Sequence, residues 1–318
     1  MKNVLVYLNL EERHKRLLEA AGKDCAFTYV LGDALTPEQV SEADIIIGNV
    51  PASWITGSSR LELLQLFSAG ADPYLKPGVL SPNTVMANAT GAYGKAVSEH
   101  AFAMTLMLMK KLYLYRDYQR QCRWQDAGMV TSLTDATVLV VGLGDIGLAY
   151  ARLAKALGAY VIGVKRRPGE RPEGVDELCG TEELDKLLPR ADVVVTFLPG
   201  SESTRHFFTW ERFEKMKPTA YFVNCGRGSA VETGVLLRAL REGQIAAAAT
   251  DVTEIEPLPE DSPLWQQDNL VITPHVAGNF HLADILERIV EIAAGNLEAH
   301  LAGQPVRNIV DLKTGYRK

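Results

Sequence analysis

The sequence predicts an α/β protein with two doubly wound parallel sheets, and three observations support this fold class. Short apolar runs alternate with helical stretches along most of the 318 residues. Glycines at GxGxxG spacing stand between one such run and a helical stretch. Loops rich in glycine and polar residues follow the runs, as they do at the carboxyl ends of strands in open parallel sheets.

The glycine motif lies in a complete strand, turn, helix and strand unit at residues 137–167. A β-branched run precedes Gly142, Gly144 and Gly147, and a helix at 148–157 and a strand at 160–164 follow them. The first glycine permits a tight turn, the second lets a pyrophosphate approach the backbone, and the third allows helix and strand to pack closely. The unit predicts a Rossmann dinucleotide-binding domain.

The second strand of this unit ends in Lys165, Arg166 and Arg167. Dinucleotide folds usually place an acid on the adenosine ribose about 20 residues past the glycines. A carboxylate there repels a 2′-phosphate, whereas a guanidinium binds a phosphate through two hydrogen bonds. We therefore expect NADP in preference to NAD. The alternative is a solvated basic turn after the strand.

Composition limits the class of protein. A hydrophobic content of 47% allows a large core, and the length favours two domains. The net charge of −6 argues against nucleic-acid and anionic-membrane partners. The four cysteines lack CxxC spacing, which favours a reducing cytoplasm and predicts no metal site. No signal peptide is expected at the N-terminus, and the apolar segment 101–109 is too short to span a bilayer.

Two sets of alternating elements divide the chain. Strands are expected in the first part at 4–8, 44–48, 63–67 and 85–88, with helices at 12–21 and 37–41, and in the second part at 192–197, 221–224, 246–250 and 270–273. A long helix at 96–121 is expected to bridge the domains and to offer a dimer surface, and a helix at 283–301 to return to the first domain. We therefore predict a flavodoxin-like substrate domain at 1–97 and 283–318, and the Rossmann domain at 98–282.

Three charged residues follow predicted strands of the second domain: Arg227 in NCGRGSAV, Glu256 in DVTEIEP and His275 in TPHVAG. A proton donor and a fixed cation lower the barrier of a reaction that puts negative charge on an oxygen beside them. An imidazole exchanges a proton near neutral pH, and a neighbouring carboxylate favours its charged form. The alternatives are a structural ion pair for Arg227, a solvated loop charge for Glu256 and a strand-end cap for His275.

With the glycine unit, these motifs resemble the D-isomer-specific 2-hydroxyacid dehydrogenase family along essentially the whole chain. The resemblance implies hydride exchange between a nicotinamide and C2 of a 2-hydroxy or 2-keto acid. It implies that His275 is the acid and base, that Glu256 is its partner, and that Arg227 binds and polarises the substrate.

The resemblance extends to residues around these motifs. It implies cofactor contacts from the backbone amides of Asp145 and Ile146 and from Leu198, Pro199, Thr204, Cys225, Asp251 and Gly278. It implies that the loop Ala69, Gly70 and Ala71 holds the substrate carboxylate, with Val50 beside it. Trp124 resembles a tryptophan of the family in the segment after the bridging helix, where a dimer arm or a packing role is expected.

The glycine-rich loops that follow the predicted strands of the first domain contain few basic residues. We therefore expect the substrate to be a short monocarboxylate such as glyoxylate or hydroxypyruvate. Alternatives are a phosphoglycerate dehydrogenase that uses NAD and a non-catalytic, dinucleotide-sensing protein of the same fold; a methyltransferase does not account for the three later motifs. A homodimer is expected. Surface or packing roles are expected for the histidines His14, His100, His206 and His300, and a pocket-lining role for His281.

Overall fold

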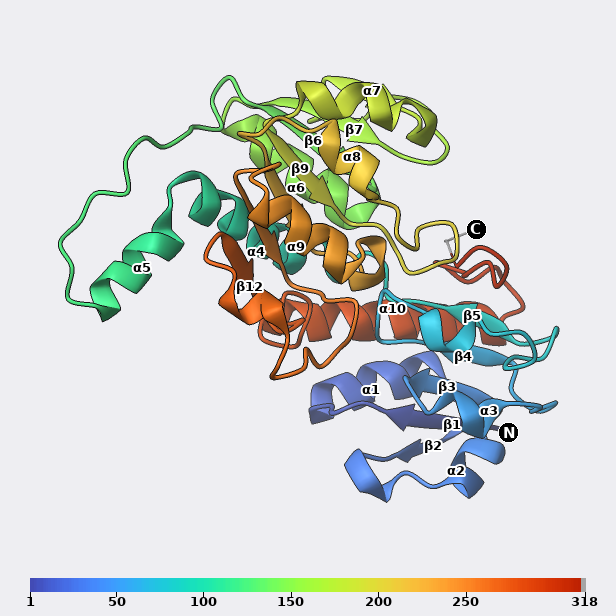
Figure 1. Ribbon diagram of the computed structural model, residues 1–318. Helices are drawn as coiled ribbons and strands as arrows, with labels where there is room; N and C mark the ends of the chain where they lie inside the picture. Colours follow the sequence, from blue (N-terminus) through green and yellow to red (C-terminus); the bar gives the residue numbers. More distant parts are fainter. Residues whose placement is uncertain (316–318) are drawn as a thin grey trace. The chain divides into compact units, whose positions relative to one another are not determined.

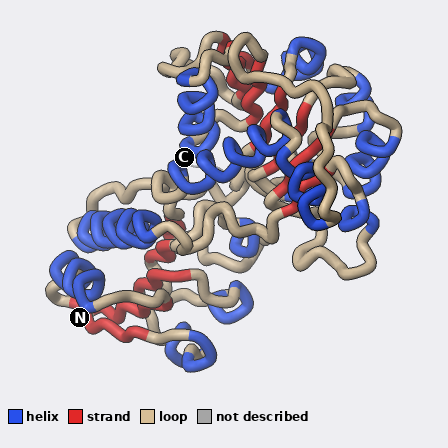
Figure 2. The backbone as a smooth tube through the Cα atoms, turned by 90° about the vertical axis from the view of Figure 1, so that its left-hand side faces the viewer, coloured by secondary structure: helices blue, strands red, loops and turns tan. Residues whose placement is uncertain are grey.

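A computed structural model describes residues 1–315. The chain forms two compact units: unit 1 comprises Met1–Tyr93 and Leu282–Lys318, and unit 2 comprises Gly94–His281. The domain boundaries predicted from the sequence are 97/98 and 282/283, a few residues from these. Unit 2 takes in the whole of α4 (Gly94–Met109), because this helix packs against α6 (Asp145–Ala156) and against strands of the second sheet. Figures 1 and 2 show the elements of both units.

Over the described residues, unit 1 holds a five-stranded parallel sheet with the order β2-β1-β3-β4-β5. Its strands are β1 (Lys2–Tyr7), β2 (Cys25–Tyr29), β3 (Ile45–Gly48), β4 (Leu63–Gln65) and β5 (Val85–Ala87). Its α-helices are α1 (Glu12–Ala21), α2 (Pro37–Ser41), α3 (Ala52–Ile55) and α10 (Ala283–Leu301). This strand order is that of flavodoxin-like sheets. Helix α10 packs on α1 and β4, so the C-terminal segment completes the unit that the N-terminus begins.

Unit 2 holds a parallel sheet with the order β12-β11-β10-β9-β6-β7-β8. Its strands are β6 (Thr137–Val141), β7 (Tyr160–Val164), β8 (Glu177–Cys179), β9 (Val193–Thr196), β10 (Tyr221–Asn224), β11 (Ala247–Thr250) and β12 (Leu270–Ile272). The strand order reverses between β6 and β9, as in a Rossmann sheet. The predicted fold class is therefore confirmed for both units.

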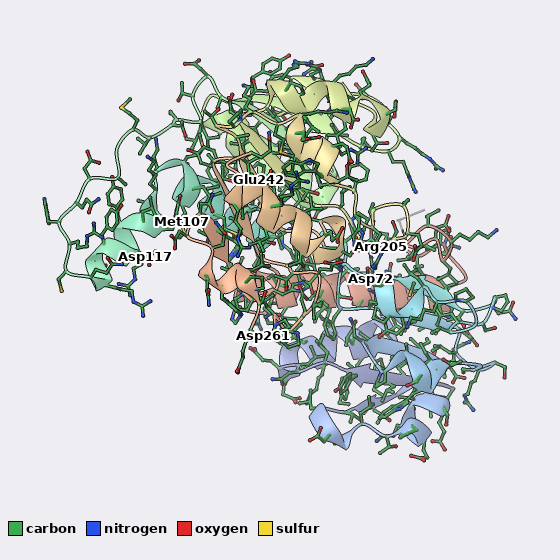
Figure 3. All side chains as sticks on the ribbon, in the orientation of Figure 1. Asp72, Met107, Asp117, Arg205, Glu242 and Asp261 are labelled. Carbon is green, nitrogen blue, oxygen red and sulfur yellow. The ribbon has the colours of Figure 1, made fainter. Side chains whose placement is uncertain are left out.

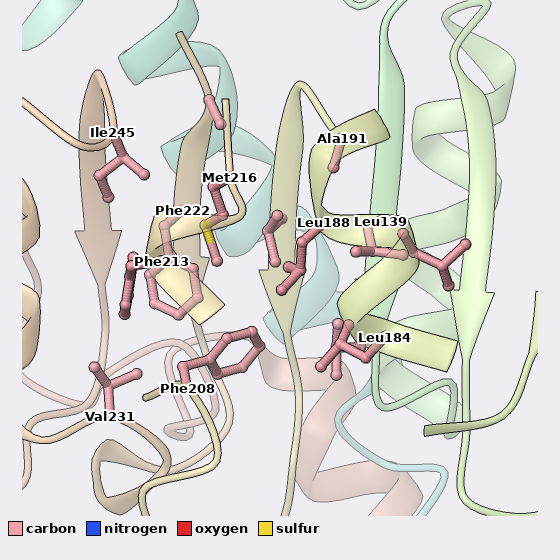
Figure 4. Close-up of a cluster of buried hydrophobic side chains, with 14 of the residues drawn as sticks. Leu139, Leu184, Leu188, Ala191, Phe208, Phe213, Met216, Phe222, Val231 and Ile245 are labelled. Atoms are coloured by element: carbon pink, nitrogen blue, oxygen red, sulfur yellow. The ribbon is translucent and has the colours of Figure 1, made fainter. Parts of the chain in front are cut away.

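The core of unit 2 fixes the strands whose ends carry the candidate site (Figure 4). Phe222 of β10 lies edge-on to Phe208 and to Phe213 of α8 (Trp210–Glu214), with ring centroids 5.0 and 5.2 Å apart. Leu139 of β6 and Leu184 of α7 (Leu184–Leu187) belong to the same buried cluster. Such aromatic contacts contribute beyond the area that they bury, so β10 offers a rigid base for its C-terminal loop.

The long helix predicted at 96–121 is wrong in one respect: it is broken. Helix α4 ends at Met109, Lys111 adopts a left-handed conformation with φ of 55°, and α5 (Leu112–Arg120) follows as a separate helix. The apolar spacing continues through the break, which is why the sequence pattern does not reveal it. No side chain of α5 is buried.

Helix α5 belongs to an arm, residues 110–132, that leaves the body of unit 2 and returns to it (Figure 1). The ends of the arm meet where the Thr131 amide donates to the Met109 carbonyl, at 3.2 Å. Trp124 and Met129 are almost fully exposed, and side chains such as Asp117 extend outward from the arm (Figure 3). In residues 1–315, no helix has both the length and the apolar character needed to cross a membrane.

Candidate active site

The glycine turn after β6 fits the pyrophosphate of a dinucleotide. Gly142 has φ of +96°, and a Cβ there would lie 3.0 Å from the carbonyl carbon of Phe197. A Cβ on Gly147 would lie 2.3 Å from the Gly142 carbonyl oxygen, so helix and strand approach too closely for any side chain. Gly144 faces open space, with no atom of the described residues within 4 Å of a Cβ built there.

Helix α6 begins at Asp145, three residues before the helix that the sequence predicts at 148–157. Its first intrahelical bond runs from the Leu148 amide to the Gly144 carbonyl, at 2.9 Å. The amides of Asp145, Ile146 and Gly147 precede that bond and point out of the positive end of the helix. Together with the open surface at Gly144, they form a suitable cradle for phosphate oxygens.

Other residues that are expected from the sequence to contact the cofactor follow β7 and β9. Lys165 is half-buried and Arg166 and Arg167 are exposed, so this end of β7 is cationic. The buried Thr204 hydroxyl donates to the Pro199 carbonyl at 2.6 Å, which closes the loop after Leu198 on itself.

Cys225 lies directly after β10 with its Sγ 3.9 Å from Sδ of Met104. Burial raises the pKa of the Cys225 thiol, so it stays neutral and acts as a packing group. Gly278 is half-buried, three residues beyond His275.

A turn after β10 presents Arg227. The buried Asn224 side chain accepts from the Gly226 amide and donates to the Arg227 carbonyl, both at 3.1 Å. A Cβ on Gly226 would lie 2.6 Å from the Leu198 carbonyl oxygen, so the turn packs directly on the loop after β9. The Arg227 guanidinium donates to the Gly226 carbonyl at 3.0 Å.

Glu256 and His275 meet from the loops after β11 and β12. His275 Nδ1 lies 2.7 Å from Glu256 Oε2, and the other carboxylate oxygen accepts from the Thr253 amide at 2.9 Å. A carboxylate accepts but does not donate, so Nδ1 carries a hydrogen and Nε2 is the nitrogen left for proton exchange. The two side chains are 47% and 37% exposed, which leaves the pair accessible to a small molecule.

The turn that holds His275 is strained and is secured by Asp251. His275 has φ of 51°, an unusual conformation for a residue with a side chain. Its amide donates to the Asp251 carbonyl at 2.7 Å, while the Asp251 carboxylate accepts from the amides of Val276 and Ala277 at 3.0 and 3.1 Å. Asp251 is 3% exposed. The resemblance implies a cofactor contact for this residue, and the structure shows in addition a clamp on the His275 turn.

A second imidazole and carboxylate pair lies beside these loops and was not expected from the sequence. His206 Nε2 lies 2.8 Å from Glu254 Oε1, while Glu254 Oε2 accepts from the amide and hydroxyl of Thr233 at 2.9 and 3.0 Å. The His206 amide also donates to the Ser229 carbonyl, at 2.7 Å. His206 is therefore neither a free surface residue nor simple packing, because it joins the loops that carry Arg227 and Glu256.

The loop after β4 in unit 1 turns its carbonyl groups toward the body of the unit. The carbonyls of Phe67, Ser68 and Ala69 accept from Tyr93 Oη at 2.6 Å, the Ala89 amide at 3.0 Å and Asn88 Nδ2 at 2.7 Å. The Gly70 carbonyl accepts from the Ser68 hydroxyl at 2.6 Å.

The amides of Ser68, Ala69, Gly70 and Ala71 donate to no group in residues 1–315. Successive backbone amides of this kind can bind an anion. Val50, named as a neighbour of this loop, is 2% exposed and belongs to the core, and its carbonyl accepts from Tyr74 Oη at 2.6 Å.

Two of the remaining histidines pair with carboxylates that are distant in the sequence. His14 and His300 pair with Glu287 and Glu62 in unit 1, each at 3.1 Å. His281 is exposed at the end of unit 2. His100 contacts Thr273, two residues before His275.

A Rossmann sheet with a phosphate cradle, whose neighbouring strands β10, β11 and β12 present a guanidinium, a carboxylate and an imidazole, defines a dinucleotide-dependent oxidoreductase. Comparison with known proteins gives the family. Residues 102–277 match the family described as D-isomer specific 2-hydroxyacid dehydrogenase, NAD binding domain.

Relatives and solved structures agree with this match. The chain is 29% identical to a glyoxylate reductase of Korarchaeum cryptofilum, over 86% of this chain and 84% of that protein. It is 35% identical to a D-isomer specific 2-hydroxyacid dehydrogenase family protein from Aeromonas salmonicida, with a TM-score of 0.84 and coverage of 98% and 100%. A D-isomer specific 2-hydroxyacid dehydrogenase from Xanthobacter autotrophicus, solved with NADPH and MES, is 29% identical, with a TM-score of 0.84 and coverage of 99% and 100%.

The chain therefore belongs to the D-isomer-specific 2-hydroxyacid dehydrogenase family. The predicted family and the predicted class, an NAD(P)-dependent D-2-hydroxyacid dehydrogenase, are confirmed.

Proposed function

We propose that the protein reduces a short 2-keto acid such as glyoxylate or hydroxypyruvate to the D-2-hydroxy acid, with NADPH preferred to NADH. The observation that carries this proposal is the hydrogen-bonded pair of His275 and Glu256, with its 2.7 Å contact at Nδ1 and its accessible Nε2. The relative named glyoxylate reductase and the related structure solved with NADPH support the choice of substrate and cofactor.

His275 is the acid in this proposal. The nicotinamide of a dinucleotide bound at the glycine turn would supply the hydride to C2 of the keto acid. As C2 is reduced, the carbonyl oxygen becomes an alkoxide, and the proton on His275 Nε2 passes to it. Glu256 holds Nδ1–H and stabilises the charged ring before transfer, while Arg227 stabilises the negative charge on the oxygen. In the reverse direction His275 accepts the proton from the hydroxyl group.

The loop Ser68–Ala71 is proposed to hold the substrate carboxylate through its amides. Asn88→Ala tests this role, because it removes the donor that turns the Ala69 carbonyl inward. We expect KM for the keto acid to rise about tenfold, the value of one hydrogen bond to a charged group, with KM for NADPH unchanged. Asn83→Ala, an exposed asparagine in the same unit, is the control.

The end of β7 is proposed to bind the 2′-phosphate of NADPH through Lys165, Arg166 and Arg167. These side chains are the cationic groups at the strand end where dinucleotide folds contact the adenosine ribose. The residues that follow β9, β10, β11 and β12 and for which the resemblance implies cofactor contacts are proposed to line the same cofactor. They are Leu198, Pro199, Thr204, Cys225, Asp251 and Gly278.

The deciding experiment is an initial-rate comparison of glyoxylate, hydroxypyruvate, pyruvate, branched-chain keto acids and phosphohydroxypyruvate, each with NADPH and with NADH. Highest kcat/KM for one short acid with NADPH supports the proposal. A preference for NADH leaves the basic strand end as a solvated turn, and a preference for the phosphorylated acid favours a phosphoglycerate dehydrogenase. No turnover with bound dinucleotide favours the sensing protein.

We further propose that two copies associate through the arm. The side chains of Trp124 and Met129 are almost fully exposed to solvent. Leu112 and Val130, on the same arm, are about half exposed. Apolar side chains gathered on a projecting segment mark an interaction surface. A second copy carries the identical surface, so pairing about a two-fold axis covers both.

A further inference from the structure

His100 of α4 contacts the polar groups that surround the turn of His275. Its Nε2 lies 3.0 Å from the hydroxyl of Thr273, the first residue after β12, and 3.7 Å from Asp251 Oδ1. Thr273 in turn lies 2.6 Å from the same carboxylate oxygen. The sequence indicated only a surface or packing role for His100, since its partners stand more than 150 positions away in the chain.

The hydrogens in this chain of contacts can be assigned from the geometry. Asp251 accepts from the amides of Val276 and Ala277, so its carboxylate is an acceptor. The Thr273 hydroxyl has one hydrogen, and it donates this hydrogen to Asp251. Its contact with His100 is therefore one in which Nε2–H of His100 donates and the hydroxyl oxygen accepts. His100 fixes the direction of the Thr273 hydroxyl.

That direction matters because Asp251 holds His275. The Asp251 carboxylate receives hydrogen bonds from Thr273, Val276 and Ala277, and its carbonyl receives the amide of His275. These bonds maintain the left-handed conformation of His275, with φ of 51°. Without the donor on His100, the Thr273 hydroxyl can rotate toward other acceptors, and the clamp loses one of its bonds.

We propose that His100 is a positioning residue that keeps His275 aligned with Glu256, acting through Thr273 and Asp251. The effect is indirect, since His100 contacts neither His275 nor Glu256 in the part of the chain that the structure describes. This inference rests on the acid–base role proposed above for His275. It predicts that a change on α4 alters the hydrogen bonding of an imidazole on a different element.

The test is the ring nitrogen spectrum of cofactor-free protein, recorded by two-dimensional 1H–15N NMR on uniformly labelled material, with the His275 signals assigned by their loss in His275→Gln. In the parent protein, the His275 signals should report one tautomer with its hydrogen on Nδ1. His100→Phe keeps a ring but has no donor, and should give a tautomer mixture for His275. Thr273→Val should have the same effect.

Conservative variants should rescue the signature. In His100→Gln an amide N–H can donate to Thr273, and in Thr273→Ser the hydroxyl remains, so both should keep the parent tautomer. Thr105→Val is the matched control: it removes a buried hydroxyl of α4 that bonds Tyr150 at 2.8 Å. It should destabilise the protein and leave the His275 signals unchanged.

Steady-state kinetics supply the second readout. His100→Phe should lower kcat by about 10- to 100-fold, the effect of a small misplacement of a reacting group, with KM for NADPH unchanged. Parent-like His275 signals in both His100→Phe and Thr273→Val would overturn the inference. Full activity of His275→Gln would instead overturn the proposed function. The two outcomes are distinguishable, because the effect of His100→Phe on the His275 signals does not depend on turnover.

Discussion

A single hydrogen bond sets which nitrogen of His275 can exchange a proton. Glu256 accepts the hydrogen on Nδ1 at 2.7 Å, so Nε2 is the nitrogen left to take up and release a proton. His275→Gln keeps a polar side chain but has no group that exchanges a proton near neutral pH. We expect reduction of the keto acid to fall about 10²- to 10⁴-fold, the usual contribution of a general acid. NADPH affinity, measured by fluorescence titration, should stay within twofold of the parent, and unchanged turnover would exclude His275 as the acid.

The proposed preference for NADPH also depends on single residues. Lys165→Asp places a carboxylate where a 2′-phosphate would bind, and that carboxylate can accept from a free 2′-hydroxyl instead. We expect kcat/KM with NADPH to fall by about 10- to 100-fold, which corresponds to the loss of one hydrogen bond between charged groups. The value with NADH should rise or hold. The control is Arg241→Ala on α9 (Thr233–Arg241), and equal loss with both cofactors would mean that Lys165 serves the fold alone.

At the scale of elements, Glu254 ties the loop after β11 to the first turn of α9. Burial alone would raise the pKa of Glu254, but hydrogen bonds from the Thr233 amide, from His206 and from the Thr233 hydroxyl outweigh it, so the pKa is lowered. A lowered pKa means that the carboxylate stabilises the fold above its unfolded pKa of about 4.3. That contribution disappears as the pH falls through the folded value.

Glu254→Gln should therefore destabilise unit 2 at neutral pH. We expect a loss of about 1.5 to 3 kcal/mol at pH 7, typical of hydrogen bonds to a charged group. The difference from the parent should narrow as the pH falls below about 4, because the parent carboxyl then becomes neutral as well. Urea unfolding of both proteins across this range measures it, and a gap that is constant with pH would show that the charge contributes nothing.

Some helices and strands can be predicted from the sequence, and others cannot. The β-branched run at 137–141 coincides with β6, because a buried central strand needs a continuous apolar segment. The sequence does not reveal the edge strands β2 and β8, whose side chains are mostly half-buried, in contrast to those of β6. The break at Lys111 depends on one backbone angle, which the apolar spacing does not encode.

Some residues of the candidate site can likewise be predicted from the sequence, and others are found only in the fold. Arg227, Glu256 and His275 stand out because each lies in a distinctive motif at a strand end. The residues that hold them in place were not identified, because His206 and Glu254 are 48 positions apart and His100 and Thr273 are 173 apart. A search for polar residues that flank each motif would have found Glu254, but only the fold supplies its partners.

The two units present different kinds of candidate binding group. Unit 1 presents backbone amides after β4, and unit 2 presents charged side chains after β10, β11 and β12. In both units the groups follow the carboxyl ends of parallel strands, where ligands of open sheets bind. The arm at 110–132 takes no part in either set, and its apolar side chains need a different explanation.

The proposed association of two copies through the arm would account for them. Trp124 and Met129 lie on a segment that the body of unit 2 does not cover, and exposed apolar surface of this kind is stabilised by burial against a partner. The double change Trp124→Ser and Met129→Ser should convert a dimer into a monomer in light scattering after size exclusion. Leu31→Ser, at a half-exposed leucine of unit 1, should leave the dimer intact. A parent protein that is already monomeric at micromolar concentration would refute the proposed role of the arm.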